Sequence, residues 1–137
     1  MIFLDTSYLV ALVMRSDALH AAAVEWSGRV SGPCVTTEYV LVELVNRLSA
    51  PLHRSRAHAL LASVSSNAQI QVIPASEQWF RAGVALHAER NDKAWSLTDC
   101  ISFEVMRATG VTQALTYDQH FEQAGFSALL RRPAATS

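Results

Sequence analysis

The chain has 137 residues, close to the size of one ordinary domain, and its 50% apolar and 17% charged residues exclude an intrinsically disordered chain. Eleven Lys and Arg residues against 12 Asp and Glu residues give a formal net charge of −1, without the bulk positive field of a non-specific DNA binder. Cys34 and Cys100 both lie in apolar runs and support neither a disulfide framework nor a zinc site.

The apolar segment 2–14 is not a targeting or membrane segment by its composition. No basic region precedes it, Asp5 interrupts it, and it is too short to cross a bilayer. We therefore expect a cytoplasmic protein with one domain at 1–132 and a frayed tail at 133–137.

Short β-rich runs alternate with longer helical patterns along the chain. The pattern predicts strands at residues 1–4, 34–36, 69–73 and 111–116, with a less pronounced one at 126–130. It predicts helices at residues 7–14, 18–30, 37–49, 54–65, 76–89 and 97–109. Asp17 is the expected N-cap of the second helix, and Gly110 the expected end of the last. This alternation predicts an α/β fold whose parallel sheet is covered by helices on both faces.

Acidic residues follow two of the expected strands. Asp5 comes directly after the first strand and Asp118 directly after the fourth. Ligands of open α/β sheets bind beyond the carboxyl ends of the strands, which makes both aspartates candidate site residues. For each residue taken alone, an N-cap or an Asx turn explains the aspartate as well.

Two further acids lie on expected helices. Glu43 is surrounded by apolar residues, where an ionised carboxylate is costly unless it is paired or coordinates a metal. A surface ion pair with Arg47, one turn later, is the alternative to an inward carboxylate. Asp99 and Ser96 have the spacing of a capping box, which alone would explain the aspartate.

Together, the four acids predict a shared pocket rather than independent caps. An all-oxygen cluster suits Mg²⁺ or Mn²⁺, and two such ions about 4 Å apart promote phosphodiester cleavage by activating water and stabilising the leaving oxygen. Glu38 lies five residues before Glu43, and Glu104 lies five residues after Asp99, so each is rotated by roughly 140° around its helix from that candidate ligand. Both therefore fit the cluster less well. Glu122 lies four residues after Asp118 and is expected to be an auxiliary ligand.

Four segments resemble, in order and spacing, the motifs of the PIN-domain ribonucleases, in particular the VapC-type toxins of bacterial toxin–antitoxin pairs. They read FLDTS at 3–7, TEYVLVE at 37–43, SLTDC at 96–100 and LTYDQHF at 115–121, and the resemblance covers nearly the whole chain. It implies a three-layer α/β/α fold with a central parallel sheet of about five strands. It also implies a catalytic and metal-binding quartet with a neighbouring hydroxyl, formed by Asp5, Glu43, Asp99, Asp118 and Thr116.

The same resemblance implies a Mg²⁺- or Mn²⁺-dependent endoribonuclease, an RNA substrate, a small antitoxin protein and a homodimer. Gln119 departs from the family pattern, in which a basic residue often occupies this position. A response-regulator receiver would need an acidic pair after the first strand, and a haloacid-dehalogenase phosphatase would need an acid where Ser7 stands. A non-catalytic PIN-like module that binds proteins stays open as an alternative, and a metal-dependent nuclease assay separates it from the enzyme.

Basic and aromatic residues suggest how RNA would be held. Ten of the 11 basic residues are Arg, whose planar guanidinium suits phosphate. The densest basic run lies at 53–58, and we expect it to bind RNA phosphate or a partner's carboxylates, or else to face solvent. Tyr117, beside Asp118, is the candidate for base stacking, because the other aromatic residues lie at spacings typical of a core: Trp26, Trp79, Trp95 and Tyr8.

Overall fold

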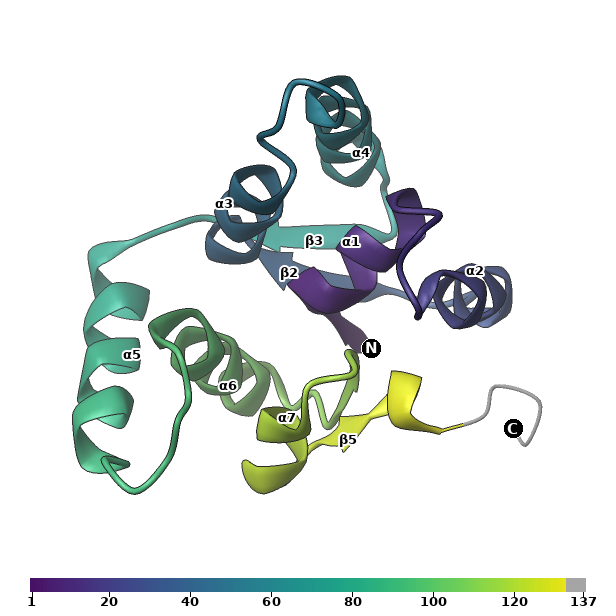
Figure 1. Ribbon diagram of the computed structural model, residues 1–137. Coiled ribbons are helices and arrows are strands. Elements are labelled where there is room, and N and C mark those ends of the chain that lie inside the picture. The colour runs from purple at the N-terminus through teal and green to yellow at the C-terminus, as the bar shows by residue number, and fades with distance from the viewer. Residues whose placement is uncertain (133–137) are drawn as a thin grey trace.

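Five short parallel strands form one sheet in the order β3-β2-β1-β4-β5 (Figure 1). The computed structural model describes residues 1–132. In register, Phe3 of the first strand pairs with Val35 on one side and Ala114 on the other, so this strand is central. The strands are β1 (Ile2–Leu4), β2 (Cys34–Thr37), β3 (Ile70–Ile73), β4 (Gln113–Leu115) and β5 (Ser127–Ala128).

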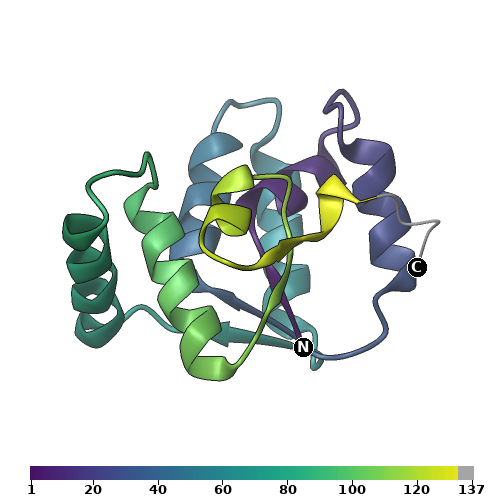
Figure 2. The ribbon, with the colours of Figure 1, turned by 90° about the horizontal axis from the view of Figure 1, so that it is seen from below.

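Helices cover both faces of this sheet, so the predicted three-layer α/β/α fold with five strands is confirmed. Figures 1 and 2 show the first four helices on one face and the last three on the other. The strand order reverses between β1 and β4, which is where open α/β sheets bind ligands. The helices are α1 (Thr6–Val13), α2 (His20–Arg29), α3 (Glu38–Arg47), α4 (Arg54–Ser66), α5 (Glu77–Glu89), α6 (Leu97–Thr109) and α7 (Gln119–Gln123), and a 3₁₀ helix follows at Leu129–Arg131.

Two expectations about the elements were wrong. Asp17 does not cap α2, because that helix begins at His20 after Leu19. Its Oδ1 instead accepts a hydrogen bond of 2.8 Å from the Leu19 amide, which is an Asx turn in the loop before the helix. The expected last strand at 126–130 is shorter, since only Ser127–Ala128 pairs with β4 before the chain enters the 3₁₀ helix. The expected tail at 133–137 lies outside the described residues.

A cluster of buried aromatic rings joins the C-terminal elements. The Phe103 ring of α6 packs edge-on against two other rings. Its centroid lies 5.0 Å from that of Trp95 and 4.9 Å from that of Phe121 in α7. Trp95 also donates a hydrogen bond of 2.9 Å from Nε1 to Gln123 Oε1. These contacts pack α6 and the segment before it against α7. Trp95 and Tyr8 are core residues, only 3% and 5% exposed.

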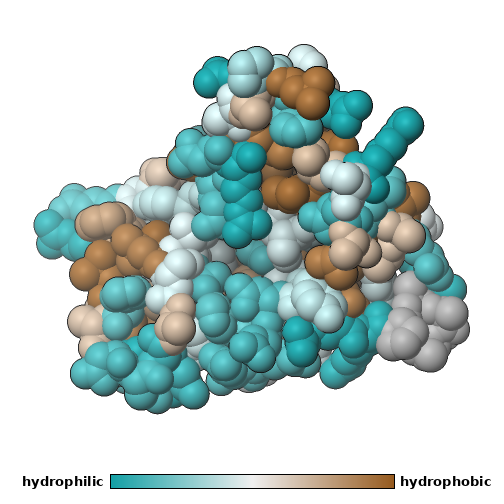
Figure 3. Space-filling model, in the orientation of Figure 1, coloured by the Kyte–Doolittle hydropathy of each residue, from teal (hydrophilic) through white to brown (hydrophobic). Residues whose placement is uncertain are grey.

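Helix α5 packs on the outside of α6, away from the sheet (Figure 1). Gly83 permits this close approach, because a Cβ atom there would collide with the side chain of Ile101. The outer surface of α5 carries exposed apolar side chains, Phe80 at 49% and Val84 at 41%, and Figure 3 shows a hydrophobic region over this helix. Within residues 1–132, no helix is long and apolar enough to span a membrane.

Candidate active site

The four predicted acids line one hollow of about 210 Å³ at the carboxyl ends of β1 and β4. They come from four separate segments of the chain, and the fold brings all of them together. The hollow is completed by Thr6, Ser7, Arg47, Ala94, Ser96 and His120. Because the sheet reverses its strand order at this place, the acids occupy the position where this class of fold binds its ligands.

Asp5 is the most deeply buried of the four, with 6% of its surface exposed. It stands at the N-cap position of α1, yet its side chain makes no capping hydrogen bond. Its Oδ2 accepts hydrogen bonds from Thr116 Oγ1 at 2.7 Å and from Ser7 Oγ at 3.0 Å. Burial is the main reason that its pKa is raised to about 6; the charge of Asp99 also raises it, whereas the two hydroxyls lower it.

Thr116 links Asp5 to Asp118. Its Oγ1 donates to Asp5 and accepts a hydrogen bond of 3.0 Å from the Asp118 amide. Asp118 caps α7, because its Oδ1 accepts a hydrogen bond of 2.9 Å from the His120 amide. The predicted neighbouring hydroxyl therefore lies between two of the four acids, and Asp118 both caps a helix and lines the hollow.

Asp99 also has two roles in this structure. The predicted capping box is present: Ser96 Oγ accepts a hydrogen bond from the Asp99 amide at 3.0 Å, and Asp99 Oδ2 accepts one from the Ser96 amide at 3.1 Å. The same carboxylate lies 3.0 Å from His120 Nδ1. Burial raises the pKa of Asp99, as does the charge of Asp118, while hydrogen bonds from Ser96 and His120 lower it. Capping and membership of the cluster are thus compatible.

Glu43 is half-buried on α3 and lines the hollow, as an inward carboxylate would. Within residues 1–132 it forms no ion pair with Arg47, which lines the hollow too. Glu122 is placed elsewhere: it is exposed, and its Oε1 lies 2.9 Å from Arg131 Nε. The structure therefore brings the quartet and Thr116 together and leaves Glu122 outside the hollow.

His120 belongs to the cluster although no role was predicted for it. Its Nδ1 lies 3.0 Å from Asp99 Oδ2 and 3.3 Å from Asp118 Oδ1, and one donor atom from each of the three residues falls within 4.8 Å of the others. Neighbouring ligands of an octahedral ion with bonds of about 2.1 Å are about 3.0 Å apart. Carboxylate oxygens with one imidazole nitrogen are therefore a donor set that fits a divalent cation of the Mg²⁺ or Mn²⁺ type.

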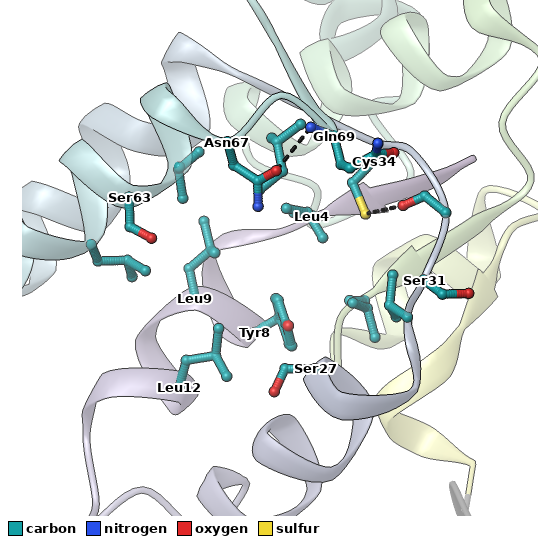
Figure 4. A pocket seen from close by; sticks show the side chains of 16 residues that line it. Leu4, Tyr8, Leu9, Leu12, Ser27, Ser31, Cys34, Ser63, Asn67 and Gln69 are labelled. Atoms are coloured by element: carbon teal, nitrogen blue, oxygen red, sulfur yellow. Dashed lines mark hydrogen bonds between the residues drawn. The ribbon is translucent and has the colours of Figure 1, made fainter.

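A separate apolar hollow, of about 370 Å³, lies between α1, α2 and α4 and is shown in Figure 4. Apolar side chains such as Leu9 and Leu12 dominate its wall, and no acidic residue lines it. Two of its polar side chains are hydrogen-bonded to nearby backbone: Cys34 Sγ donates to the Gly32 carbonyl at 3.8 Å, and Asn67 Oδ1 accepts from the Gln69 amide at 2.8 Å. The acidic hollow is the one with groups suited to metal-assisted chemistry.

Comparison with known proteins agrees with this geometry. The PIN domain family matches residues 2–127. The 23S rRNA-specific endonuclease VapC20 from two Mycobacterium tuberculosis strains, CDC 1551 / Oshkosh and ATCC 25618 / H37Rv, is 32% identical over 130 residues, which cover 92% of this chain and 95% of the relative. The crystal structure of M. tuberculosis VapC20, described as a Sarcin-Ricin loop cleaving toxin, matches with a TM-score of 0.87 and 26% identity over 94% of this chain and 98% of that chain. The chain therefore belongs to the PIN-domain family and, within it, to the VapC-type ribonuclease toxins.

Proposed function

We propose that this chain is a Mg²⁺- or Mn²⁺-dependent endoribonuclease and the toxin of a toxin–antitoxin pair. The observation that carries the proposal is the convergence of Asp5, Glu43, Asp99 and Asp118 on one hollow at the reversal of strand order. Four carboxylates that only capped helices would have no reason to converge, because their mutual repulsion and partial burial disfavour the charged forms. The family membership supports the same activity.

We assign the metal to the quartet together with His120. A divalent ion there would supply Lewis-acid stabilisation of the phosphodiester and a water activated at neutral pH. The chain itself orients the ligands: Thr116 and Ser7 hold Asp5, the Ser96 amide holds Asp99, and the His120 amide holds Asp118. Hydrogen bonds of this type from neighbouring groups set the direction and basicity of metal ligands.

We propose an RNA loop as the substrate. The named relatives are described as an endonuclease specific for 23S rRNA and as a toxin that cleaves the Sarcin-Ricin loop. Loops expose unstacked bases and an accessible backbone, which a shallow site can bind. Arg47, exposed at the edge of the acidic hollow, offers a guanidinium for a phosphate next to the cleaved bond.

We also propose a small antitoxin and a second copy of the chain as partners. Arg56, from the basic run at 53–58, lines a hollow of about 420 Å³. Arg15 and His20 line the same hollow, together with the apolar residues Leu12 and Leu60. An acidic, amphipathic segment of an antitoxin suits this mixture of charge and apolar surface. Light scattering of the isolated chain, and co-purification with the product of the adjacent gene, test both partners. A cytoplasmic location is part of the proposal and is supported by two free, buried cysteines.

The decisive experiment is an RNA cleavage assay with the purified chain in Mg²⁺, in Mn²⁺ and in excess EDTA. We expect cleavage with either ion and none in EDTA. Mapping the cut ends on total RNA after induction then identifies the substrate loop. Cleavage that persists in EDTA would contradict the metal requirement, and a chain that never cleaves RNA but binds protein partners would be a non-catalytic PIN-like module.

A further inference from the structure

A second hollow, of similar size, adjoins the acidic one. Its volume is about 260 Å³, and three of its lining residues, Ser7, Arg47 and Asp118, also line the acidic hollow. The two spaces therefore share a wall. An RNA strand that places a phosphodiester bond beside the acids can therefore place its next nucleotide in this second hollow. The remaining lining residues are Val10, Asp17, Leu19 and Tyr117.

Tyr117 gives this hollow an aromatic surface held in place from several sides. It is 46% exposed although its neighbours in sequence on both sides are part of the acidic site. The Arg131 guanidinium lies over the ring, 4.9 Å from its centroid, and donates a hydrogen bond of 3.0 Å to the Tyr117 carbonyl. Arg131 is itself held by an ion pair with Glu122, and the Tyr117 amide donates to Ser7 Oγ at 3.3 Å. An exposed ring positioned in this way is a platform on which a nucleobase can stack.

Asp17 supplies a hydrogen-bond acceptor in the same hollow. It is half-buried, and the hydrogen bond from the Leu19 amide to Oδ1 orients its carboxylate. Among residues 1–132, no group donates a hydrogen bond to Asp17 Oδ2, so this oxygen can accept a hydrogen bond from a ligand. Adenine, cytosine and guanine carry an exocyclic amino group, whereas the donor on the pairing edge of uracil is a ring N–H between two carbonyl oxygens that a carboxylate repels. The carboxylate therefore favours a base that carries an amino group.

Arg47 stands between the two hollows. It is exposed in the last turn of α3, and across residues 1–132 it forms no ion pair. Its guanidinium can reach a phosphate that links a nucleotide in the acidic hollow to one in the second hollow. The shared wall thus carries a cation where the backbone of the RNA would pass.

We propose that the second hollow is a nucleobase subsite, which binds the base of the nucleotide next to the cleaved bond. The base stacks on Tyr117, its amino group donates to Asp17, and Arg47 binds the intervening phosphate. The inference rests on the proposed ribonuclease function and adds the base preference of the site. Val10 and Leu19 line the same space and offer apolar contact for the flat faces of a base.

The test measures binding of fluorescein-labelled RNA hexamers to the full chain by anisotropy, at low ionic strength in EDTA. The probes are adenosine, cytidine and uridine hexamers and an abasic ribose-phosphate hexamer. We expect the adenosine and cytidine hexamers to bind more tightly than the uridine and abasic ones. Tyr117→Ala should weaken binding of adenosine and cytidine hexamers about 5- to 150-fold and leave the abasic hexamer unchanged, whereas Tyr117→Phe keeps the ring and the affinity. Asp17→Asn should remove the advantage of adenosine and cytidine over uridine.

Phe80→Ala is the matched control, because Phe80 is an equally exposed aromatic residue on α5, and its variant should bind every hexamer as the parent chain does. Equal binding of all hexamers, or an equal loss for base-containing and abasic hexamers in Tyr117→Ala, would overturn the subsite. If Tyr117→Ala weakens binding of the antitoxin and of no RNA, the hollow belongs to the protein partner and the proposal is wrong. Cleavage of total RNA with and without Mg²⁺, measured in parallel, reports separately on the ribonuclease function.

Discussion

Thr116 donates a hydrogen bond of 2.7 Å from its hydroxyl to Oδ2 of Asp5, across 111 positions of the sequence. The two residues follow β4 and β1, the neighbouring strands between which the strand order reverses. Because Thr116 Oγ1 also accepts from the Asp118 amide, one fully buried hydroxyl positions two of the four acids. The stability of the sheet and the arrangement of the site therefore depend on the same group.

Replacing Thr116 with Val should lower the free energy of unfolding by about 1–3 kcal/mol, since it leaves the Asp118 amide and the Asp5 carboxylate without their buried partner. It should also raise the pKa of Asp5 further, because the Thr116 hydrogen bond is one of the contacts that lower it. Urea unfolding in EDTA measures the first effect. Thr116→Ser should restore most of the stability, and Thr109→Val, which removes an exposed hydroxyl at the end of α6, is the control. Equal effects of the two valine substitutions would contradict the role of Thr116.

Asp5 should make the metal-free fold less stable as pH rises. The ordinary pKa of an aspartate is 3.8, whereas that of Asp5 in the fold is about 6. The folded state therefore holds the proton more tightly than the unfolded chain does. The stability that protonated Asp5 contributes to the fold is fully present below pH 3.8, declines between pH 3.8 and about 6, and is lost above that range. The shift corresponds to about 3 kcal/mol. Asp5→Asn should therefore melt at a higher temperature than the parent chain at pH 7 in EDTA and at a similar one at pH 4.

Thermal melts from pH 4 to pH 8 measure this effect. Divalent ions that bind only the fold should restore the stability of the parent chain, by about 2.7 kcal/mol at a hundredfold excess over Kd, and should do less for Asp5→Asn. Asp92→Asn is the control, because Asp92 is exposed and the Arg90 guanidinium lowers its pKa, so this variant should not gain stability at pH 7. Parallel pH profiles of Asp5→Asn and the parent chain would show that Asp5 is not desolvated.

Cleavage should depend on the acids of the hollow and not on acids elsewhere. Asp5→Asn and Asp99→Asn should each reduce the rate of RNA cleavage more than about 100-fold while the circular dichroism spectrum is retained, since loss of a ligand exceeds the effect of losing an outer contact. Asp92→Asn removes an acid outside the hollow and should cleave normally. Full activity of both hollow variants would mean that neither carboxylate takes part in cleavage.

His120→Gln should weaken Mn²⁺ binding about tenfold without abolishing it, because the carboxylates remain. In the parent chain, the electron spin echo of bound Mn²⁺ should carry the ¹⁴N modulation of a directly coordinated imidazole, and the substitution should remove it. His87→Gln, on α5, changes a histidine outside the acidic hollow and should leave both measurements unchanged. A persistent ¹⁴N signal with an unchanged Kd in His120→Gln would show that His120 only contacts the carboxylates.

Alternating hydrophobic patterns were sufficient to predict the parallel sheet and the longer helices, and three of these helices are bounded by a local signal: Thr37, Ser76 and Gly110. Helix α7 was not predicted, since five residues are too few to show a helical period. His120 was missed with it, although its position two residues after Asp118 is that of a residue at a helix start. Contacts between distant segments leave no local trace in the sequence.

Glu122 illustrates the same limit. Its spacing from Asp118 suggested a common helix face and an auxiliary role in the cluster. In the structure it instead forms an ion pair with Arg131, which lies in the 3₁₀ helix after β5. The convergence of the quartet was predictable because Asp5 and Asp118 follow strands and Glu43 lies in an apolar helical setting, where a charged side chain needs a special reason, while Asp99 completed the family pattern. The hydrogen bonds that orient these acids became visible only in the folded chain.

The central position of β1 has a consequence for the synthesis of this protein. Asp5, Glu43 and Asp99 are all synthesised before β4, the neighbour of β1 at the reversal of strand order, which begins only at Gln113. A growing chain that has not reached β4 therefore has three of the four acids and no strand to bring Asp118 beside them. The four acids can converge only after β4 and the residues that follow it have been synthesised, so we expect a chain that stops before residue 118 to lack cleavage activity.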